Sequence, residues 1–490
     1  MGLALLAWLF PRDGIQVGGV LLEFPSLSEV MGSSENQDNI DEQEAEEESD
    51  EVEELSPEEL MAQRLAALHA AKDSEFVSYM EGSSTRFYMP DDDVAYLDPF
   101  FEALLNASRK PLRIMYFGDS QLECDRITDV LREHLQSEFG GSGAGLLPAV
   151  QTISTTTARV ATWPELRRCV GFGAEGQRSG SRRYGPMSQV AYVTGSATFT
   201  VTGIGGKSFA HSASFRKVSV AMAGNGTLTI VRGEEEQEMH CAQDSTYTGM
   251  RIFTALLPSS TSKVTIKAIG QMEVFGIMAD GSVGVSVDNI AMRGSSGTHF
   301  TSLESSTFTP FFRQQNVALI LLQYGGNSVP YLKGGKSISN YKRQMKAQIE
   351  YLKRISPHSR IIYVGPADMA TSSEEGHMHT YSQLPQIVDS LRAAALESGV
   401  AFWDMYRVMG GRGSMVKWVN ARPQLAGEDY IHFTPKGARH ISNILCETID
   451  YYYKYYRFRH GLDKEKLPED TIENDTKDMP VDSLTAVRHP

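Results

Sequence analysis

Short apolar segments alternate with segments of helical spacing in the second half of this 490-residue chain, and this order constrains the fold more than any other feature. The apolar runs have the length of strands, and the segments between them have the length and pattern of helices. The alternation covers residues 317–322, 338–355, 360–364, 384–398, 400–403 and 435–456. Strands that alternate with helices form a parallel sheet covered on both faces. The sequence therefore predicts an α/β domain.

The same rhythm begins earlier, with the apolar run at residues 112–117 and the turn Gly118-Asp119-Ser120. Apolar residues recur at helical spacing from residue 127 to 139, so strand, turn and helix follow in order. A serine at a strand-to-helix turn has an exposed hydroxyl next to free backbone amides. Ser120 is therefore a candidate nucleophile, although a helix cap is the commoner explanation of an isolated Gly-Asp-Ser.

A different pattern separates these two parts of the α/β domain. Short runs of alternating polar and apolar residues, divided by Gly, Asn and Ser, occur at residues 197–201, 218–222, 228–231 and 264–267. We interpret residues 151–284 as an inserted β-sandwich. The α/β domain is then divided into residues 56–150 and 285–462.

The two ends of the chain differ in composition from the folded body. Residues 3–10 are apolar but stop before Arg12, well short of the roughly 20 residues that span a bilayer. Two interpretations stay open: the end of a longer membrane anchor whose start is missing, or the core of a signal peptide. Acidic residues crowd positions 35–59, so we expect residues 1–55 to end in a disordered tether and residues 463–490 to form a disordered tail.

Composition excludes some classes of function. The formal net charge is −15, which argues against the basic footprint that nucleic-acid binding needs. No CxxC spacing occurs, so a zinc ribbon is excluded. Disulfides and buried free thiols stay equally open for the four cysteines, Cys124, Cys169, Cys241 and Cys446.

A carboxylate and a histidine lie three residues apart just before the last predicted helix. Asp429 can accept a hydrogen bond from the Nδ1 atom of His432, which leaves Nε2 free to take a proton from a serine. A helix cap beside a surface histidine is the alternative for this pair.

Two further segments supply candidate hydrogen-bond donors. Asn327 belongs to a Gly-Gly-Asn turn directly after the predicted strand 317–322, at the sheet edge where ligands bind. Its side-chain amide can donate to a developing oxyanion. Gly294 follows the β insertion and can offer a backbone amide to the same oxyanion.

Taken together, Gly118-Asp119-Ser120, Gly294, Gly326-Asn327 and Asp429-x-x-His432 resemble the four blocks of the SGNH/GDSL hydrolase family, in the family's order. The resemblance implies a flavodoxin-like, three-layer parallel sheet. It also implies a nucleophile at Ser120 completed by Asp429 and His432, an oxyanion hole formed by Ser120, Gly294 and Asn327, and no cofactor or metal. The resemblance leaves the insertion and both tails unaccounted for.

Within that family, residues 117–121 and the position of the insertion are similar to bacterial peptidoglycan O-acetylesterases, which carry a carbohydrate-binding-like module there. Gln121 departs from many of these relatives, which have histidine. The resemblance implies an O-acylated polysaccharide as substrate and a periplasmic or cell-envelope location. A glycan O-acetyltransferase with the same triad and a non-catalytic glycan-binding envelope protein stay open as alternatives.

Three other features have plainer explanations. His377 and His379 form an HxH pair without a third ligand nearby in the sequence, so we do not expect a metal there. Asp404 competes with Asp429 as triad acid, but an aspartate at a strand end usually caps the next turn. The tyrosines at 451–456 fit a packing face of the last helix better than a glycan platform.

Overall fold

The computed structural model describes residues 15–17, 20–22, 56–172, 174–206, 209–241 and 248–462. The chain separates into two compact units, Met1–His69 and Ala70–Pro490. In the first unit, β1 (Ile15–Val17) and β2 (Val20–Leu22) pair in antiparallel fashion. The apolar residues 3–10, the acidic residues 35–55 and the tail from residue 463 onward lie outside the described residues.

Helix α3 (Pro57–Gly82) begins at Ser56-Pro57-Glu58-Glu59, a capping sequence that is typical of a helix start. The Ser56 backbone amide donates to Glu59 Oε2 at 2.8 Å, and the Glu59 amide donates to Ser56 Oγ at 3.3 Å. This reciprocal pair satisfies two amides that the first helical turn leaves without partners.

The centre of the larger unit is a six-stranded sheet. Its strands lie in the order β13 (Val285–Ala291), β4 (Leu112–Gly118), β14 (Val317–Gln323), β15 (Arg360–Val364), β18 (Ala401–Trp403) and β3 (Phe87–Tyr88). All pairs are parallel except the one between β18 and β3. Without β3, the chain order is 2-1-3-4-5, the flavodoxin-like arrangement, so the predicted fold class is confirmed.

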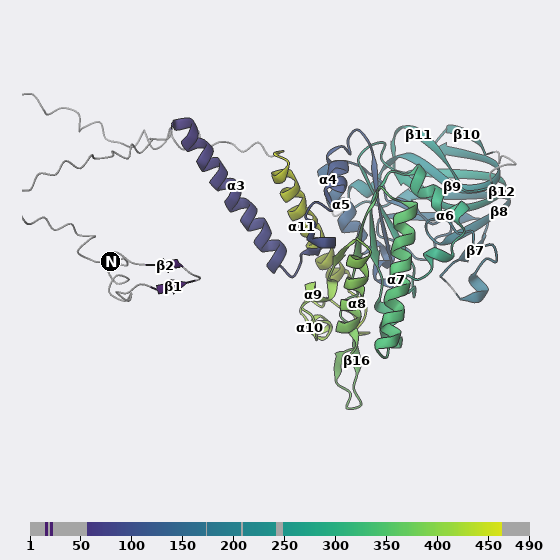
Figure 1. Cartoon of the computed structure of the whole chain (residues 1–490). Helices are drawn as coiled ribbons and strands as arrows, with labels where there is room; N and C mark the ends of the chain where they lie inside the picture. Colours follow the sequence, from purple (N-terminus) through teal and green to yellow (C-terminus); the bar gives the residue numbers. More distant parts are fainter. Residues whose placement is uncertain are drawn as a thin grey trace, which may run out of the picture. The chain divides into compact units, whose positions relative to one another are not determined.

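Helices cover both faces of this sheet (Figure 1). Successive residues of β4 point to opposite faces: Met115 and Phe117 join one apolar core, and Ile114 and Tyr116 join the other. Helices α6 (Ser305–Gln314), α7 (Gly335–Ile355) and α8 (Leu384–Glu397) pack on the first face. Helices α4 (Asp98–Leu105), α5 (Thr128–Phe139) and α11 (Pro435–Arg459) pack on the second. The short helices α9 (Met405–Val408) and α10 (Ser414–Asn420) and the hairpin β16 (Ala370–Ser372) and β17 (Met378–Thr380) complete the domain.

The insertion is an antiparallel β module with its own apolar core. Hydrogen bonds join all eight strands into one continuous sheet, with the long strands β8, β9 and β12 at its centre. The strands are β5 (Gly145–Leu147), β6 (Ala158–Trp163), β7 (Arg167–Val170), β8 (Gln189–Gly203), β9 (Phe215–Arg232), β10 (Glu235–Cys241), β11 (Arg251–Thr261) and β12 (Lys263–Asp280). Strand β5 lies before residue 151 and nevertheless pairs with β12. The domain boundaries themselves stay a prediction.

Buried ion pairs connect the module to the α/β domain. Arg113 of β4 contacts Asp280, at the end of β12, and Asp288 of β13, each at 2.5 Å. Arg132 of α5 contacts Asp125 at 2.6 Å, and Thr157, next to β6, donates to the same carboxylate. These contacts hold the segment that follows β4 in a defined place.

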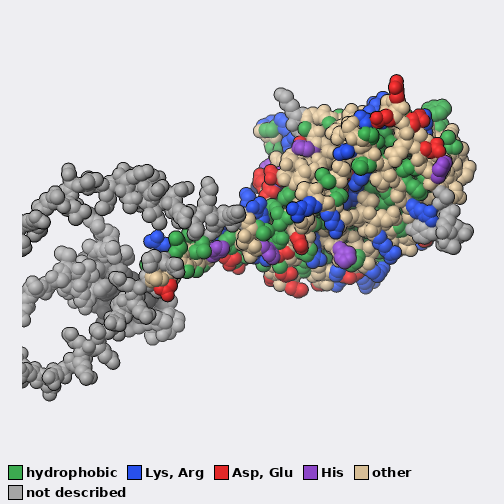
Figure 2. Space-filling model, turned by 90° about the horizontal axis from the view of Figure 1, so that it is seen from above, with side chains coloured by type: hydrophobic (Ala, Val, Ile, Leu, Met, Phe, Trp, Pro, Cys, Tyr) green, Lys and Arg blue, Asp and Glu red, His purple; other side chains and the backbone are tan. Residues whose placement is uncertain are grey.

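On the surface, basic and acidic side chains are interspersed over the face of the described chain that Figure 2 shows. That face has no broad basic patch of the kind that binds nucleic acid. Among the described residues, the helices lack the length and apolar character needed to cross a bilayer.

Candidate active site

Ser120 lies at the carboxyl edge of the parallel sheet. It follows the last residue of β4 by two positions and opens the 3₁₀ helix η2 (Ser120–Asp125). The turn is tight: a Cβ atom on Gly118 would lie 2.7 Å from Leu122 Cδ1. Glycine at this position therefore lets η2 fold back against the end of the strand.

A continuous line of hydrogen bonds connects Ser120 to the turn before α11. Ser120 Oγ lies 2.8 Å from His432 Nε2, and His432 Nδ1 lies 2.7 Å from Asp429 Oδ2. The second carboxylate oxygen of Asp429 accepts from the backbone amides of Ile431 and His432, both at 3.0 Å. Burial raises the pKa of Asp429, but these hydrogen bonds outweigh it and hold the pKa below its ordinary value. Asp429 therefore stays ionised at neutral pH and can orient the imidazole.

Gln121 holds the same turn by two hydrogen bonds, and reasoning from the sequence missed this role. Its Nε2 atom donates to the Ile431 carbonyl at 2.6 Å, and its Oε1 atom accepts from the Phe433 amide at 3.3 Å. One side chain thus holds the backbone on both sides of His432. The only signal in the sequence was the departure from histidine at this position.

Gly294 and Asn327 line the same cavity, of about 330 Å³, as Ser120 and His432. Asn327 lies in η6 (Gly326–Tyr331), directly beyond the end of β14. Its Nδ2 atom donates to Asp119 Oδ2 at 3.1 Å and to the Ser295 carbonyl at 3.2 Å. Gly294 has a φ of +75°, and its α-carbon faces open space. Four of the five predicted residues, Ser120, Gly294, Asn327 and His432, thus line one cavity, and Asp429 is connected to it through its hydrogen bond with His432.

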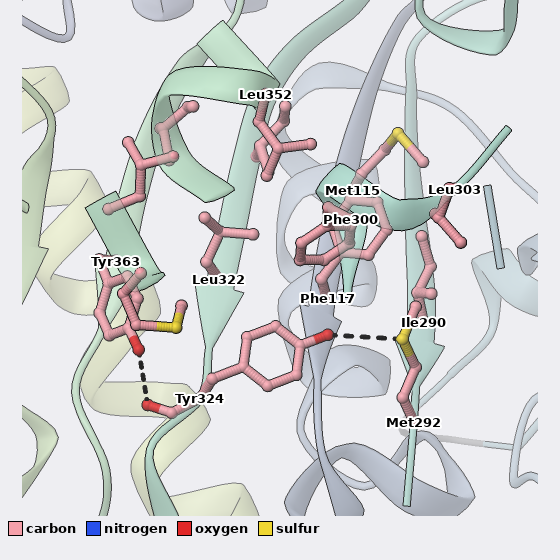
Figure 3. Packing of buried hydrophobic residues seen from close by; sticks show 14 of the residues in the cluster. Met115, Phe117, Ile290, Met292, Phe300, Leu303, Leu322, Tyr324, Leu352 and Tyr363 are labelled. Carbon is pink, nitrogen blue, oxygen red and sulfur yellow. Dashed lines mark hydrogen bonds between the residues drawn. The ribbon is translucent and has the colours of Figure 1, made fainter. Parts of the chain in front are cut away.

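The buried core behind the cavity fixes the two donor segments relative to each other (Figure 3). The Tyr324 hydroxyl donates to Met292 Sδ at 3.6 Å, and the Tyr363 hydroxyl donates to the Tyr324 carbonyl at 3.0 Å. Met292 lies two residues before Gly294, and Tyr324 lies three residues before Asn327. Packing of these side chains therefore sets the spacing between the donor segments.

Asp119 is a second residue of the site that reasoning from the sequence did not assign. It is 6% exposed, and its carboxylate accepts from the Gln121 amide at 3.0 Å as well as from Asn327. Burial raises its pKa to about 6, although these hydrogen bonds and the charge of His432 act in the opposite direction. Asp119 thus joins the nucleophile turn to the Asn327 side chain.

The remaining candidates lie outside this arrangement. Asp404 caps α9, since its carboxylate accepts from the Arg407 amide at 2.9 Å. His377 and His379 lie on the β16–β17 hairpin, and the described residues contain no group of three or more metal-ligating side chains. Tyr452, Tyr455 and Tyr456 are buried in the cores beside α11. All four cysteines are free thiols.

Part of the chain matches a known protein family. Residues 277–440 match the model of the GDSL-like lipase/acylhydrolase family. The match includes Gly294, Asn327, Asp429 and His432, whereas Ser120 lies before the insertion and outside it. A search of curated proteins finds no match.

A comparison with solved structures finds several similar chains. A peptidoglycan O-acetylesterase is similar over 76% of this chain and 100% of its own, with a TM-score of 0.61 and 18% identity. A family two carbohydrate esterase from Cellvibrio japonicus covers 61% of this chain and 99% of its own, with a TM-score of 0.24 and 9% identity. An acetyl xylan esterase covers 34% of this chain and 80% of its own, with a TM-score of 0.27 and 12% identity.

Proposed function

We propose that this chain, whose residues 277–440 match the model of the GDSL-like lipase/acylhydrolase family, is a serine-dependent carboxylic ester hydrolase that removes O-acetyl groups from a cell-envelope polysaccharide such as peptidoglycan. The observation that carries the proposal is the hydrogen-bonded line from Ser120 through His432 to Asp429. It ends in a cavity that also contains Gly294 and Asn327.

The proposed reaction has two steps. His432 Nε2 takes the Ser120 proton as Oγ attacks the acyl carbon, and the resulting tetrahedral oxyanion accepts hydrogen bonds from the Ser120 and Gly294 amides and from Asn327. The C–O bond to the sugar then breaks, and the sugar oxygen takes the proton from His432. Water, deprotonated by His432, attacks the acyl-enzyme and releases acetate and free Ser120.

Asn327 must change one contact for this mechanism. An amide nitrogen carries two protons, and those of Asn327 point to Asp119 and to the Ser295 carbonyl. In the proposal, the oxyanion replaces the Ser295 carbonyl, while the contact with Asp119 holds the side chain in place. Asp119 is then a positioning residue for the oxyanion donor.

The size and lining of the site support a small acyl group on a polymer. The cavity volume of about 330 Å³ suits an acetyl group with part of a sugar. Tyr331 lies at the cavity and is 79% exposed, so its ring is free to stack on a pyranose. The fold likeness to a peptidoglycan O-acetylesterase supplies the preferred polymer. A periplasmic or cell-envelope location is part of the same proposal, because the polymer is found there.

The test is acetate release from a chromogenic acetate ester and from O-acetylated peptidoglycan by the intact chain and by Ser120→Ala. We expect kcat/KM to fall on the order of 10⁴-fold or more in Ser120→Ala. Ser372→Ala, which changes an exposed serine on β16, is the matched control and should retain full activity.

Other results would replace the proposal. Equal rates in Ser120→Ala and the intact chain would remove Ser120 as nucleophile. Transfer of the acetyl group to an added glycan instead of water would identify a glycan O-acetyltransferase. Glycan binding without acetate release by the intact chain would identify a non-catalytic binding protein.

A further inference from the structure

A second cavity, of about 410 Å³, lies where the β module meets the α/β domain. We call it the junction cavity; Glu123 and Arg293 line it from the α/β domain, and Arg168, Phe172 and Gln189 line it from the module. It lies close to the active site along the chain: Glu123 belongs to the same 3₁₀ helix as Ser120, and Arg293 precedes Gly294. Neighbouring residues of the chain thus line the two cavities.

Arg168 brings a positive charge into this cavity without a carboxylate to balance it. It lies on β7, partly buried, and its Nε atom donates to the neutral amide oxygen of Gln189 at 2.7 Å. No carboxylate of the described residues forms an ion pair with it. Burial lowers the pKa of the Arg168 guanidinium. Burial acts in the same direction on Arg113 and Arg132, but their aspartate partners outweigh it and raise the pKa.

The acidic side chain in the cavity is already paired. Arg293 donates to both carboxylate oxygens of Glu123, from Nε at 2.6 Å and from Nη2 at 2.5 Å. Glu123 and Arg293 therefore neutralise each other, and the charge of Arg168 remains. A partly desolvated cation without a counter-charge costs free energy in the free protein. An anionic ligand would recover that free energy.

We propose that the junction cavity binds a carboxylate carried by the polysaccharide substrate, through the guanidinium of Arg168. The planar guanidinium can hold a carboxylate by two parallel hydrogen bonds. Of its nitrogens, Nε already donates to Gln189. Apolar residues beside it, Val170, Phe172 and Met187, can pack against the carbon chain that bears the carboxylate. This inference rests on the proposed function and narrows its substrate. It favours an acetylated glycan with acidic substituents, such as a carboxyalkyl or peptide group, over a neutral glycan.

The first experiment compares kcat/KM of the intact chain and Arg168→Gln on three substrates: a chromogenic acetate ester, neutral acetylated xylan and O-acetylated peptidoglycan, which carries carboxylates. Loss of a hydrogen-bonded charge contact should lower kcat/KM on peptidoglycan about 10-fold or more. Rates on the two substrates without carboxylates should stay unchanged. Arg168→Lys keeps the charge but not the forked N–H donors of the guanidinium. Its kcat/KM on peptidoglycan should lie between those of the intact chain and Arg168→Gln.

Arg167→Gln is the matched control. Arg167 neighbours Arg168 on β7 and is exposed, with its guanidinium 5.1 Å from the centre of the Tyr192 ring. Its replacement removes the same charge but should not lower kcat/KM on one substrate more than on another. Equal losses in both variants, or an equal loss of Arg168→Gln on all three substrates, would overturn the proposal.

A binding measurement separates this inference from the proposed function. Ser120→Ala, with and without Arg168→Gln, is titrated with soluble peptidoglycan fragments that carry carboxylates. We expect about 10-fold weaker binding without Arg168, whatever the rate of hydrolysis. Unchanged affinity, or no binding by Ser120→Ala itself, would overturn the carboxylate site. Failure of acetate release with this binding difference intact would instead overturn only the proposed function.

Discussion

Asp119 combines a cost to stability with a contact inside the site. Its ionised carboxylate is buried at the Ser120 turn and holds the Asn327 amide. Residues that serve a site at the expense of stability are common in enzymes. The balance between the two effects in Asp119 can be measured, because its pKa of about 6 lies inside the accessible pH range.

We expect Asp119→Asn to be more stable than the parent protein above pH 6. The folded pKa of about 6 lies above the ordinary value of 3.8, so the folded state favours the protonated form. The cost of the buried charge is fully present above pH 6, shrinks as the pH falls through the folded pKa, and is absent below 3.8. The gain in free energy of unfolding should therefore reach at most about 3 kcal/mol at pH 8 and be much smaller at pH 4.

Denaturant unfolding at these two pH values checks this prediction, and esterase assays of Asp119→Asn should show reduced kcat. A stability difference that does not change with pH would contradict it.

Gln121 permits a sharper test of positioning. Gln121→Ala removes both hydrogen bonds that flank His432, so the imidazole should lose its fixed distance to Ser120. We expect kcat on a small acetate ester to fall about 10-fold or more, at nearly unchanged KM. Gln121→Glu keeps the acceptor but cannot donate to the Ile431 carbonyl, and it should resemble the alanine variant. A change in KM alone would argue against a positioning role.

Among the elements, β4 combines a central place in the sheet with buried ion pairs. It lies between β13 and β14, ends in the Ser120 turn, and contains Arg113, whose ion pairs reach Asp280 and Asp288. Both carboxylates are fully buried. Removal of their shared partner would leave Asp288 without an ion pair and Asp280 with only Lys217, at 4.0 Å.

We expect Arg113→Ala to lower the free energy of unfolding by about 3–5 kcal/mol. Arg354→Ala, at an exposed position on α7, should change it by less than about 0.5 kcal/mol. Chemical denaturation followed by circular dichroism measures both values. An effect of Arg113→Ala no larger than that of the surface control would show that the ion pairs contribute little to stability.

Elements with a strong local pattern were predictable from the sequence, and their long-range partners were not. The strands 317–322 and 360–364 and the start of α3 follow from apolar runs and a capping sequence, which need only neighbouring residues. Strand β3, of two residues, is too short to leave a pattern. Alternation identified strands in the insertion, but their pairing into one sheet depends on contacts far along the chain.

The site shows the same division. The turn around Ser120 and the spacing of Asp429 and His432 are local features, so the sequence indicated them. The contacts of Gln121 with Ile431 and of Asp119 with Asn327 join residues 310 and 208 positions apart. No spacing in a single sequence encodes such contacts, because they arise only when the sheet brings the carboxyl ends of its strands together.

At the scale of the whole molecule, the proposed mechanism uses only protein side chains, backbone amides and water. We therefore expect prolonged treatment with EDTA to leave kcat on a small acetate ester unchanged. The assay compares treated protein, untreated protein and treated protein with Zn²⁺ added back. Loss of activity with EDTA and recovery with Zn²⁺ would require a metal that the mechanism does not include.

The position of the β module also orders events during synthesis. Strand β4 is made before the module, whereas both of its neighbours, β13 and β14, are made after it. The strand that leads to Ser120 therefore has no pairing partner in the nascent chain until the module has been translated, and long-range pairing of this kind is slow. A chain truncated inside the module would contain Ser120 but lack the partner strands, the histidine and the amide donors. Esterase activity can therefore arise only in a chain whose module has already been made.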